Sequence, residues 1–101
     1  MSLPEISIER TGRGVRIINR SRDRVRVVSV TLNYRYTVAS TSSRYDQSYA
    51  SRVGSERSSP MRDLDPGSFI DIDFYPPEML VSVEVVVERG RERHVIVRNF
   101  A

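Results

Sequence analysis

The sequence contains no cysteine, no lysine and no tryptophan, and its only histidine is His94. Without cysteine, the chain forms no disulfide and offers neither a thiol nucleophile nor a cysteine-based zinc or iron–sulfur site. Without lysine, no side-chain amine is present to form a Schiff base. These absences exclude several common catalytic and metal-binding chemistries.

Long apolar runs are missing as well. No stretch approaches the ~18 consecutive apolar residues that a membrane-spanning helix needs. No segment keeps the 3.6-residue apolar period of an amphipathic helix. We therefore expect no membrane span in this chain and no helical core.

Arginine is abundant: it supplies all 16 basic residues other than His94, against 13 acids, for a net charge of +3. The charges are unevenly spread. Residues 1–36 hold eight arginines and three acids, whereas residues 37–101 hold eight arginines and ten acids. Arginine suits planar, two-point pairing with carboxylates or phosphates. The basic first third therefore has two competing explanations, internal ion pairing and anion binding.

Short runs of alternating apolar and polar residues recur along the chain, separated by turn residues. Alternation with period two is typical of half-buried β-strands. We expect one all-β domain over residues 1–101, an immunoglobulin-like antiparallel β-sandwich of about seven strands. The clearest strands are expected over residues 5–9, 15–17, 25–36, 70–74, 81–88 and 94–100.

Turn residues and a change of phase refine this expectation. Asp65-Pro66-Gly67 is a strong turn signal, and Arg89-Gly90 marks the tip of a hairpin between the last two strands. The inward-facing set changes phase between Val27 and Val28, which predicts a bulge in the long third strand.

Residues 39–60 differ from the rest of the chain because they contain eight serines interspersed with arginine and tyrosine. We interpret them as an insertion, either a long loop or a short edge strand around residues 45–49. The composition is similar to that of an antibody paratope; the alternative is a surface loop that binds nothing. The candidate protein-contact residues are Arg44, Tyr45, Tyr49 and Arg52.

Two segments carry a resemblance to a known class of domain. Val15-Arg16-Ile17-Ile18-Asn19 ends the second strand, and Leu64-Asp65-Pro66-Gly67 leads into Phe69-Ile70-Asp71-Ile72. With the long third strand, this pattern resembles immunoglobulin-like or fibronectin-type-III-like sandwiches, over about residues 5–100, although the cysteine pair and tryptophan of antibody domains are absent. The resemblance implies a fold and a habit of mediating contacts.

The topology implied by the resemblance makes specific charge pairs. It places the second strand beside the strand of Asp71 and Asp73, so Arg16 faces one of these aspartates. Opposite charges across strands contribute about 0.2–1 kcal/mol per pair and help to set the register. In the other sheet, the expected pairs join Arg24, Arg26 or Arg35 with Glu84 or Glu88.

The competing explanation is phosphate binding, with tyrosines stacking on bases. No helix-turn-helix pattern, aromatic RNA-recognition strand or groove-entering helix accompanies the arginines. A net charge of +3 is also modest for a nucleic-acid binder. The residues that would contact nucleic acid or another anion are Arg10, Arg13, Arg16, Arg20, Arg22, Arg24 and Arg26.

Catalytic and metal-binding patterns are sparse. The Gly-x-Ser-x-Gly motif is absent, and no spacing places a serine beside His94. Asp63, Asp65, Asp71 and Asp73 invite comparison with a calcium site, but their spacing fits no known loop and Asp65 before Pro-Gly is typical of a turn. We expect no enzyme activity, no metal ion and no cofactor.

These observations favour a non-catalytic protein-interaction or self-assembly module. Its expected partner is another copy of the chain or a different protein, bound through a strand edge or through residues 40–59. The candidate edges are the first strand and residues 45–49. The alternative function is arginine-rich binding of RNA or DNA.

Overall fold

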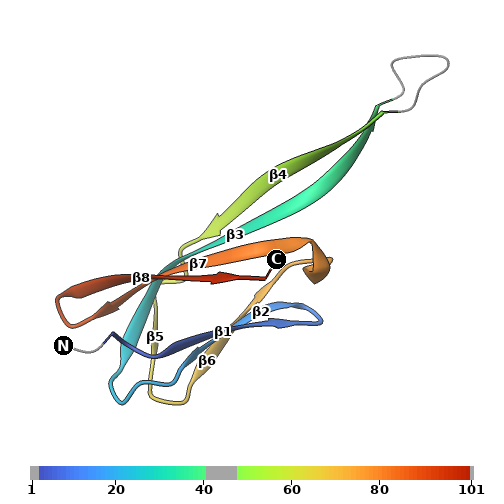
Figure 1. The fold of residues 1–101 in the computed structure, drawn as a ribbon. Coiled ribbons are helices and arrows are strands. Elements are labelled where there is room, and N and C mark those ends of the chain that lie inside the picture. The colour runs from blue at the N-terminus through green and yellow to red at the C-terminus, as the bar shows by residue number, and fades with distance from the viewer. Residues whose placement is uncertain (1–2, 41–47, 101) are drawn as a thin grey trace.

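A computed structural model describes residues 3–40 and 48–100 as a β-structure with one short 3₁₀ helix. Its eight strands are antiparallel to their neighbours (Figure 1). The elements are β1 (Ile6–Thr11), β2 (Gly14–Asn19), β3 (Val25–Ser40), β4 (Ser48–Ser58), β5 (Arg62–Leu64), β6 (Phe69–Asp73), η1 (Pro77–Met79), β7 (Leu80–Arg89) and β8 (Glu92–Asn99).

Two sheets make up the fold. One has the order β1-β2-β6, and the other has the order β4-β3-β7-β8, with β5 also paired to β3. This arrangement confirms the predicted all-β sandwich, although it has eight strands within the described residues where about seven were expected. None of the helices in the described part of the chain has the length and hydrophobicity that crossing a bilayer requires.

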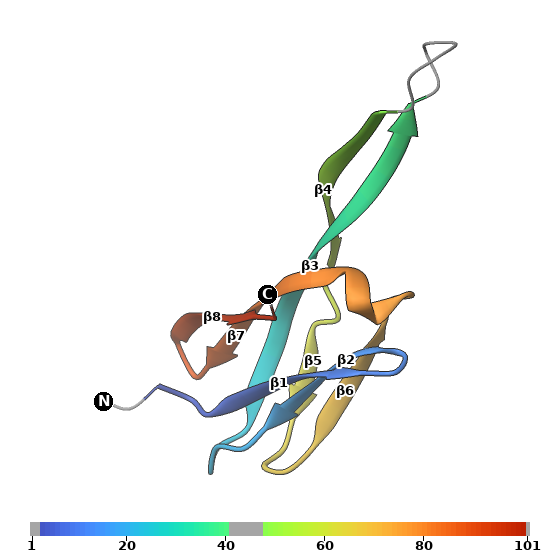
Figure 2. The same cartoon turned by 45° about the vertical axis from the view of Figure 1, so that its right-hand side comes forward.

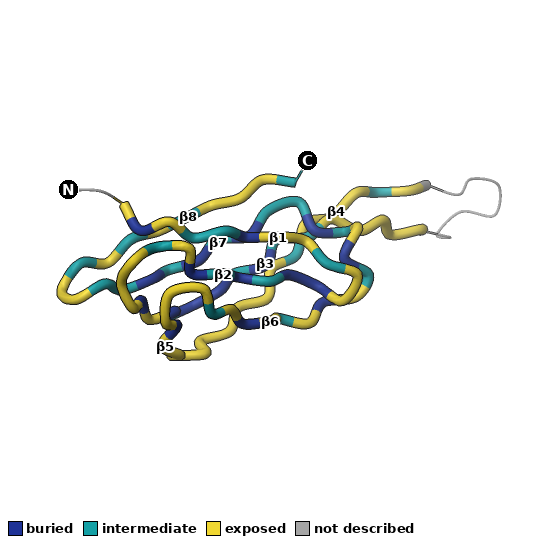
Figure 3. The backbone as a smooth tube through the Cα atoms, turned by 90° about the horizontal axis from the view of Figure 1, so that it is seen from below, coloured by how far each residue is buried: buried dark blue, intermediate teal, exposed yellow. Residues whose placement is uncertain are grey.

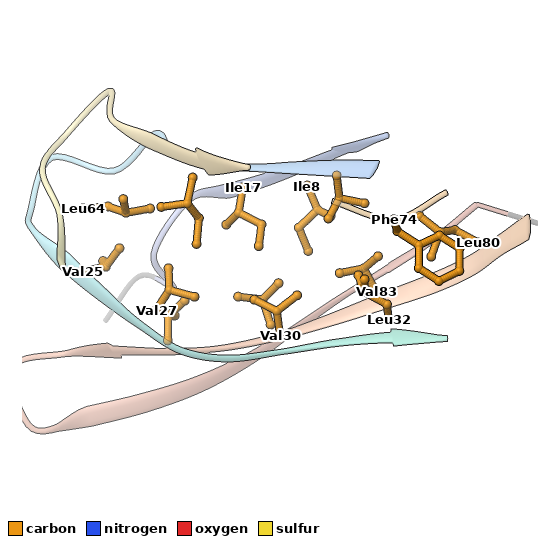
Figure 4. Close-up of a cluster of buried hydrophobic side chains, with 14 residues drawn as sticks. Ile8, Ile17, Val25, Val27, Val30, Leu32, Leu64, Phe74, Leu80 and Val83 are labelled. Carbon is orange, nitrogen blue, oxygen red and sulfur yellow. The ribbon is translucent and has the colours of Figure 1, made fainter. Parts of the chain in front are cut away.

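The core lies between the two sheets (Figure 4). Alternate residues of β2, β3 and β7 point into it, and Ile17, Val27 and Val85 are fully buried there. Burying one such side chain stabilises the fold by about 1.5–3 kcal/mol. The period-two pattern in the sequence therefore identifies the buried face of each central strand.

The predicted turns and bulge are present. Gly67 has a φ of 84°, and the N–H of Ser68 donates to the carbonyl oxygen of Asp65 at 2.9 Å. Gly90, with a φ of 62°, begins the two-residue loop that joins β7 to β8. The β3–β7 register shifts between Val27 and Ser29, which confirms the bulge.

Asn19, the last residue of β2, is fully buried and joins two turns. Its amide nitrogen donates to the carbonyl oxygens of Asp23 at 2.8 Å and Leu64 at 2.9 Å. Its side-chain oxygen accepts the backbone N–H of Ser21 at 3.0 Å. The side chain thus ties the β2–β3 turn to the end of β5. Asn19-Arg20-Ser21 matches a glycosylation acceptor, but the folded chain buries the amide that would carry the sugar.

The described part of the segment 39–60 contains more regular structure than the sequence pattern indicated. β3 continues to Ser40, and β4 pairs with it over eleven residues, from Ser48 to Ser58. The described part of the segment is therefore a long edge strand, β4, paired in a hairpin with the end of β3, where the sequence suggested a loop or a shorter edge strand around residues 45–49. Residues 41–47 lie outside the described residues.

Candidate functional site

The β3–β4 hairpin extends beyond the sandwich (Figure 2). The pairing of β3 with β7 ends at Tyr34 opposite Leu80, whereas its pairing with β4 continues to Ser40. We call residues 35–40 and 48–53 the arm. Within the described residues, the arm is a two-stranded ribbon with no third strand beside it.

The arm exposes large apolar side chains on both of its faces. On the face that continues the core side of β3, Tyr36 is 37% exposed and Val38 is 41% exposed. On the opposite face, Val53 is 65% exposed and Tyr49 is 66% exposed. The exposure along this ribbon is visible in Figure 3. A two-stranded ribbon is marginally stable alone in water, so apolar side chains on both faces mark a surface suited to contact.

Tyr34 anchors the arm to the sandwich. Its ring centroid lies 5.0 Å from that of Phe74 and 5.9 Å from that of Tyr36. The ring also covers Gly54, the residue opposite it on β4, where an added Cβ would come within 2.5 Å of a ring atom. An aromatic ring over a cross-strand glycine is a known device for pinning register. A larger residue at position 54 would therefore require the ring of Tyr34 to move.

A shallow groove opens at the base of the arm. A cavity of about 300 Å³ and a neighbouring one of about 550 Å³ share Glu56, Phe74 and Tyr75, so they form one depression. Tyr75 is 86% exposed and forms part of its wall. This basal groove is lined by Gly12, Arg13, Tyr34, Tyr36, Glu56, Asp73, Phe74, Tyr75 and Met79.

The turn between β1 and β2 holds Phe74 in place. The backbone N–H of Phe74 donates to the carbonyl oxygen of Arg13 at 2.9 Å. Gly14 follows with a φ of 146°, and an added Cβ there would lie 2.1 Å from the carbonyl oxygen of Ile72. Only glycine fits this backbone and this close approach. The β1–β2 turn is thus a structural support for the wall of the groove.

The comparisons with known proteins come out negative. No protein-family model, no curated protein and no solved structure matches this chain. The arm and the basal groove are therefore interpreted from their own residues.

The predicted protein-contact residues fall partly on the arm. Tyr49 and Arg52 lie on β4, with Arg52 opposite Tyr36 and on the same face as it. Arg44 and Tyr45 lie outside the described residues. The structure adds Tyr34 and Tyr36 from β3, together with the groove residues named above. Their sequence signal was the run of tyrosines in the third strand, whose strand pattern marked them only as core.

The predicted cross-strand ion pairs are confirmed in the three-stranded sheet. Arg16 and Asp71 are opposite each other in the β2–β6 register. The guanidinium Nε lies 2.8 Å from Oδ1 and Nη2 lies 3.2 Å from Oδ2, and the group also stacks 4.0 Å above the ring of Phe69. This two-point contact is the geometry that arginine favours.

In the five-stranded sheet, the pairing differs in detail. Arg26 is opposite Glu88, as expected, but its ion pair at 2.9 Å is with Asp63 of β5. β5 was not among the expected strands. Arg24 forms a second pair along this edge, with Asp65 at 2.8 Å.

The residues proposed for anion binding are thus largely occupied by internal contacts. Besides the three pairs above, Arg20 contacts Glu9 at 3.3 Å, and Arg10 lies 5.3 Å from the centre of the Phe100 ring. Among the described residues, Arg13 and Arg22 make no ion pair, and they sit in the turns at opposite ends of β2. These seven arginines do not form one continuous basic patch.

The ion pairs shift the pKa values of the carboxyl groups. The hydrogen bond from Arg16 lowers the pKa of Asp71, and the hydrogen bond from Arg26 lowers that of Asp63, in both cases against a weaker opposing effect of desolvation. The hydrogen bond from His94 and the contact with Arg89 lower the pKa of Glu92. All three carboxyl groups therefore favour the ionised form in the folded chain.

This ionisation predicts a loss of stability in acid. A carboxyl group with a lowered pKa stabilises the fold above its unfolded pKa, and this contribution disappears as the pH falls through the folded value. We expect the melting temperature to decline from about pH 5 to about pH 3. Asp71→Asn should make the decline shallower, whereas Asp73→Asn should not, because Asp73 makes no ion pair among the described residues. Thermal scans across this range test it, and equal slopes for both variants would contradict it.

Metal coordination has no support in the described part of the chain. No group of three or more histidine or acidic side chains there is placed to hold an ion. Asp63, Asp65 and Asp71 are paired with arginines instead. His94 contacts Glu92 at 3.0 Å, and so its role in the fold is that of a half-buried partner on β8.

Proposed function

We propose that this chain is a non-catalytic self-assembly module whose arm and basal groove contact a second copy. The observation that carries the proposal is the arm itself. It projects aromatic and branched apolar side chains from a ribbon that has no covering layer among the described residues. Exposed apolar surface of this kind marks sites of protein contact.

The composition of the two surfaces supports contact between copies. The core-side face of the arm presents Tyr36, Val38 and Ala50, and the basal groove is walled by the rings of Phe74 and Tyr75. Both surfaces are rich in aromatic or branched apolar groups, so each offers the other a surface to cover. Aromatic side chains in a pocket are also the usual energetic centres of protein interfaces.

The test removes the apolar face of the arm. Tyr36→Ser combined with Val38→Ser deletes two exposed side chains, each worth about 1.5 kcal/mol of burial at a contact, which corresponds to roughly a 100-fold loss of association. We expect light scattering on a sizing column to show an oligomer for the wild type and a smaller species for the double variant. The melting temperature measured at low concentration should stay close to that of the wild type.

Thr37→Ala is the matched control, because Thr37 lies on the same strand but on the opposite face of the arm. It should leave the mass unchanged. A wild-type monomer at every concentration would overturn the self-assembly proposal. A double variant with the same mass as an oligomeric wild type would exclude the arm as the contact.

Nucleic-acid binding remains the alternative function. Its support now comes from the arm, because Arg35 and Arg52 lie there without an ion pair among the described residues, and a two-stranded β-ribbon fits the major groove of DNA. Oligonucleotide binding can be measured on the same proteins. Equal binding by the wild type and by the Tyr36→Ser, Val38→Ser variant, together with loss of binding in an Arg35→Glu, Arg52→Glu variant, would favour this alternative.

The immunoglobulin-like relationship also belongs among the proposals. It is supported by the order of the strands: β1, β2 and β6 form one sheet, and β3, β7 and β8 form the centre and edge of the other. β4 is added beside β3, as the extra strands of variable-type immunoglobulin domains are added to the sheet of the third strand. Modules of this architecture commonly mediate contacts.

A further inference from the structure

β8 is a regular edge strand that nothing covers among the described residues. It is the last strand of the order β4-β3-β7-β8 and pairs with β7 without any register shift from Ser82–Asn99 to Arg89–Glu92. Bulges, prolines and charged side chains are devices that prevent an edge strand from pairing with another chain. β8 has no bulge and no proline, and its charged residues flank the apolar residues 95–97, so the backbone groups at its middle are open to a further strand.

The direction of the backbone groups follows from one hydrogen bond. The N–H of Phe100 donates to the carbonyl oxygen of Val81 at 2.9 Å. Because antiparallel strands alternate between bonded and non-bonded pairs, the even-numbered residues of β8 direct their backbone groups at β7. The two-residue loop at Gly90 requires the same alternation. Arg93, Val95 and Val97 therefore direct their N–H and C=O groups at the free edge.

Two of these residues, Val95 and Val97, present apolar side chains on the outer face. Val95 is 57% exposed and Val97 is 55% exposed. The edge formed by β1 is different, because Arg20 occupies its outward polar side chains, with contacts to Ser7 at 2.5 Å and Glu9 at 3.3 Å. Of these two edges, β8 is the one that carries exposed apolar side chains, Val95 and Val97, near its middle, although Arg93 beside them is paired with Glu88.

We infer that β8 pairs antiparallel with β8 of a second copy, about a two-fold axis that passes through Val95. In an isologous contact, residue i of one copy faces residue j of the other and residue j faces residue i, and directly opposite residues must lie on the same face of the sheet, so i and j are both odd or both even. The axis therefore passes through a residue and not between two residues. The choice among residues follows from which side chains each axis brings together.

An axis through Val95 satisfies both faces of the extended sheet. On the outer face, Val95 meets its own mate, and because Val86 lies beside Val95 on β7, four valines form one row across the junction. On the core-side face, Glu92 meets Arg98 of the second copy, and the symmetry makes this opposite-charge pair twice. Such cross-strand pairs stabilise a register.

An axis through Ile96 is less favourable. Val95 would then meet Val97 of the second copy, and the apolar row would end at Glu84, the β7 neighbour of Val97. His94 would meet Arg98, and Glu92 would face Phe100 instead of Arg98, so this axis makes no opposite-charge pair between the copies through Glu92. Charge complementarity therefore selects the axis through Val95.

The Val95-centred pairing joins the two β4-β3-β7-β8 sheets into one continuous sheet. About six backbone hydrogen bonds form, two for each of the three outward pairs along the junction. The contact uses neither the arm nor the basal groove, so it can be tested separately from the proposed function. The two contacts together would give each chain two separate surfaces for association, which is the condition for open assemblies.

The absence of cysteine makes a cross-linking test unambiguous. A bonded antiparallel pair has its Cα atoms about 5.5 Å apart, within the range of a disulfide. Val95→Cys therefore places two thiols face to face at the axis. Mild oxidation should convert most of this variant to a covalent dimer on a non-reducing gel, and reduction should reverse it.

Val97→Cys is the matched control, because an axis through Val95 separates the two Val97 residues by several positions along the strands. It should remain largely uncross-linked. Both variants are best oxidised with and without Tyr36→Ser and Val38→Ser, so that loss of the arm contact does not affect the readout. Failure of Val95→Cys to cross-link, or equal cross-linking of the two variants, would overturn the inference.

A second measurement addresses affinity without cysteine. Val95→Lys places two like charges at the axis while changing a side chain that is 57% exposed in the single chain. We expect dimerisation through β8 to weaken at least tenfold in light scattering in the arm-variant background. An unchanged mass for an oligomeric parent would count against the contact.

Discussion

Replacing Asn19 with alanine should lower the free energy of unfolding by about 3 kcal/mol, because buried groups that lose their hydrogen-bond partner cost roughly 1–3 kcal/mol each. Asn19 is fully buried, and its amide is the described partner of the carbonyl oxygens of Asp23 and Leu64. Alanine leaves both oxygens without that donor and removes the acceptor of the Ser21 N–H. Urea denaturation measures the change.

Asn33→Ala is the control for this prediction. Asn33 is also a strand asparagine, but within the described part of the chain its side-chain hydrogen bonds are to the hydroxyl groups of Ser82 at 3.1 Å and Ser55 at 2.6 Å. These hydroxyls can bond to water instead, so we expect a loss of about 1 kcal/mol or less. Equal losses for the two variants would show that the hydrogen bonds from Asn19 to the two turns add no more to the free energy of unfolding than those of Asn33.

Gly14→Ala should be at least as damaging, with a loss of about 4 kcal/mol. The added Cβ would lie 2.1 Å from the Ile72 carbonyl oxygen and 2.6 Å from the Phe74 nitrogen, at a backbone φ of 146°. Positive φ for a residue with a side chain costs about 1–3 kcal/mol, and overpacking adds a similar amount. For a chain of this size, we expect the melting temperature to fall by roughly 20 °C.

The neighbouring glycine provides the control. An added Cβ at Gly12 meets nothing within 4 Å, so Gly12→Ala should change the melting temperature by only a few degrees. The substitution at Gly14 should also distort the basal groove, because the backbone hydrogen bond from Phe74 to Arg13 lies next to Gly14. Comparable melting temperatures for the two alanine variants would contradict the close approach of β2 and β6 at Gly14.

Several features of the fold follow from local patterns in the sequence. The alternation in β7 predicts its buried valines, because a strand in a sandwich has one face in the core and one face outside. Gly67 and Gly90 predict the turns in which they have positive φ. The opposition of Arg16 and Asp71 followed from the expected strand order, and the ion pair confirms it.

The arm could not be predicted from the same local patterns. Its outer part has no core beneath it, so the contrast between buried and exposed residues that identifies a strand is missing around Ser51 and Arg52. Strand β4 exists because its backbone groups pair with the extension of β3. That pairing joins residues such as Tyr34 and Gly54, whose complementarity becomes visible only when the two are opposite each other.

The chain's own pattern of apolar, charged and turn residues accounts for the sandwich, its core faces and the pairing of Arg16, since these depend on period and local chemistry. The arm, the basal groove and the free edge of β8 depend on which strands become neighbours and which edges stay open. Such relationships join residues that are distant along the chain, as Arg13 and Phe74 are. They arise only when the whole sheet is assembled.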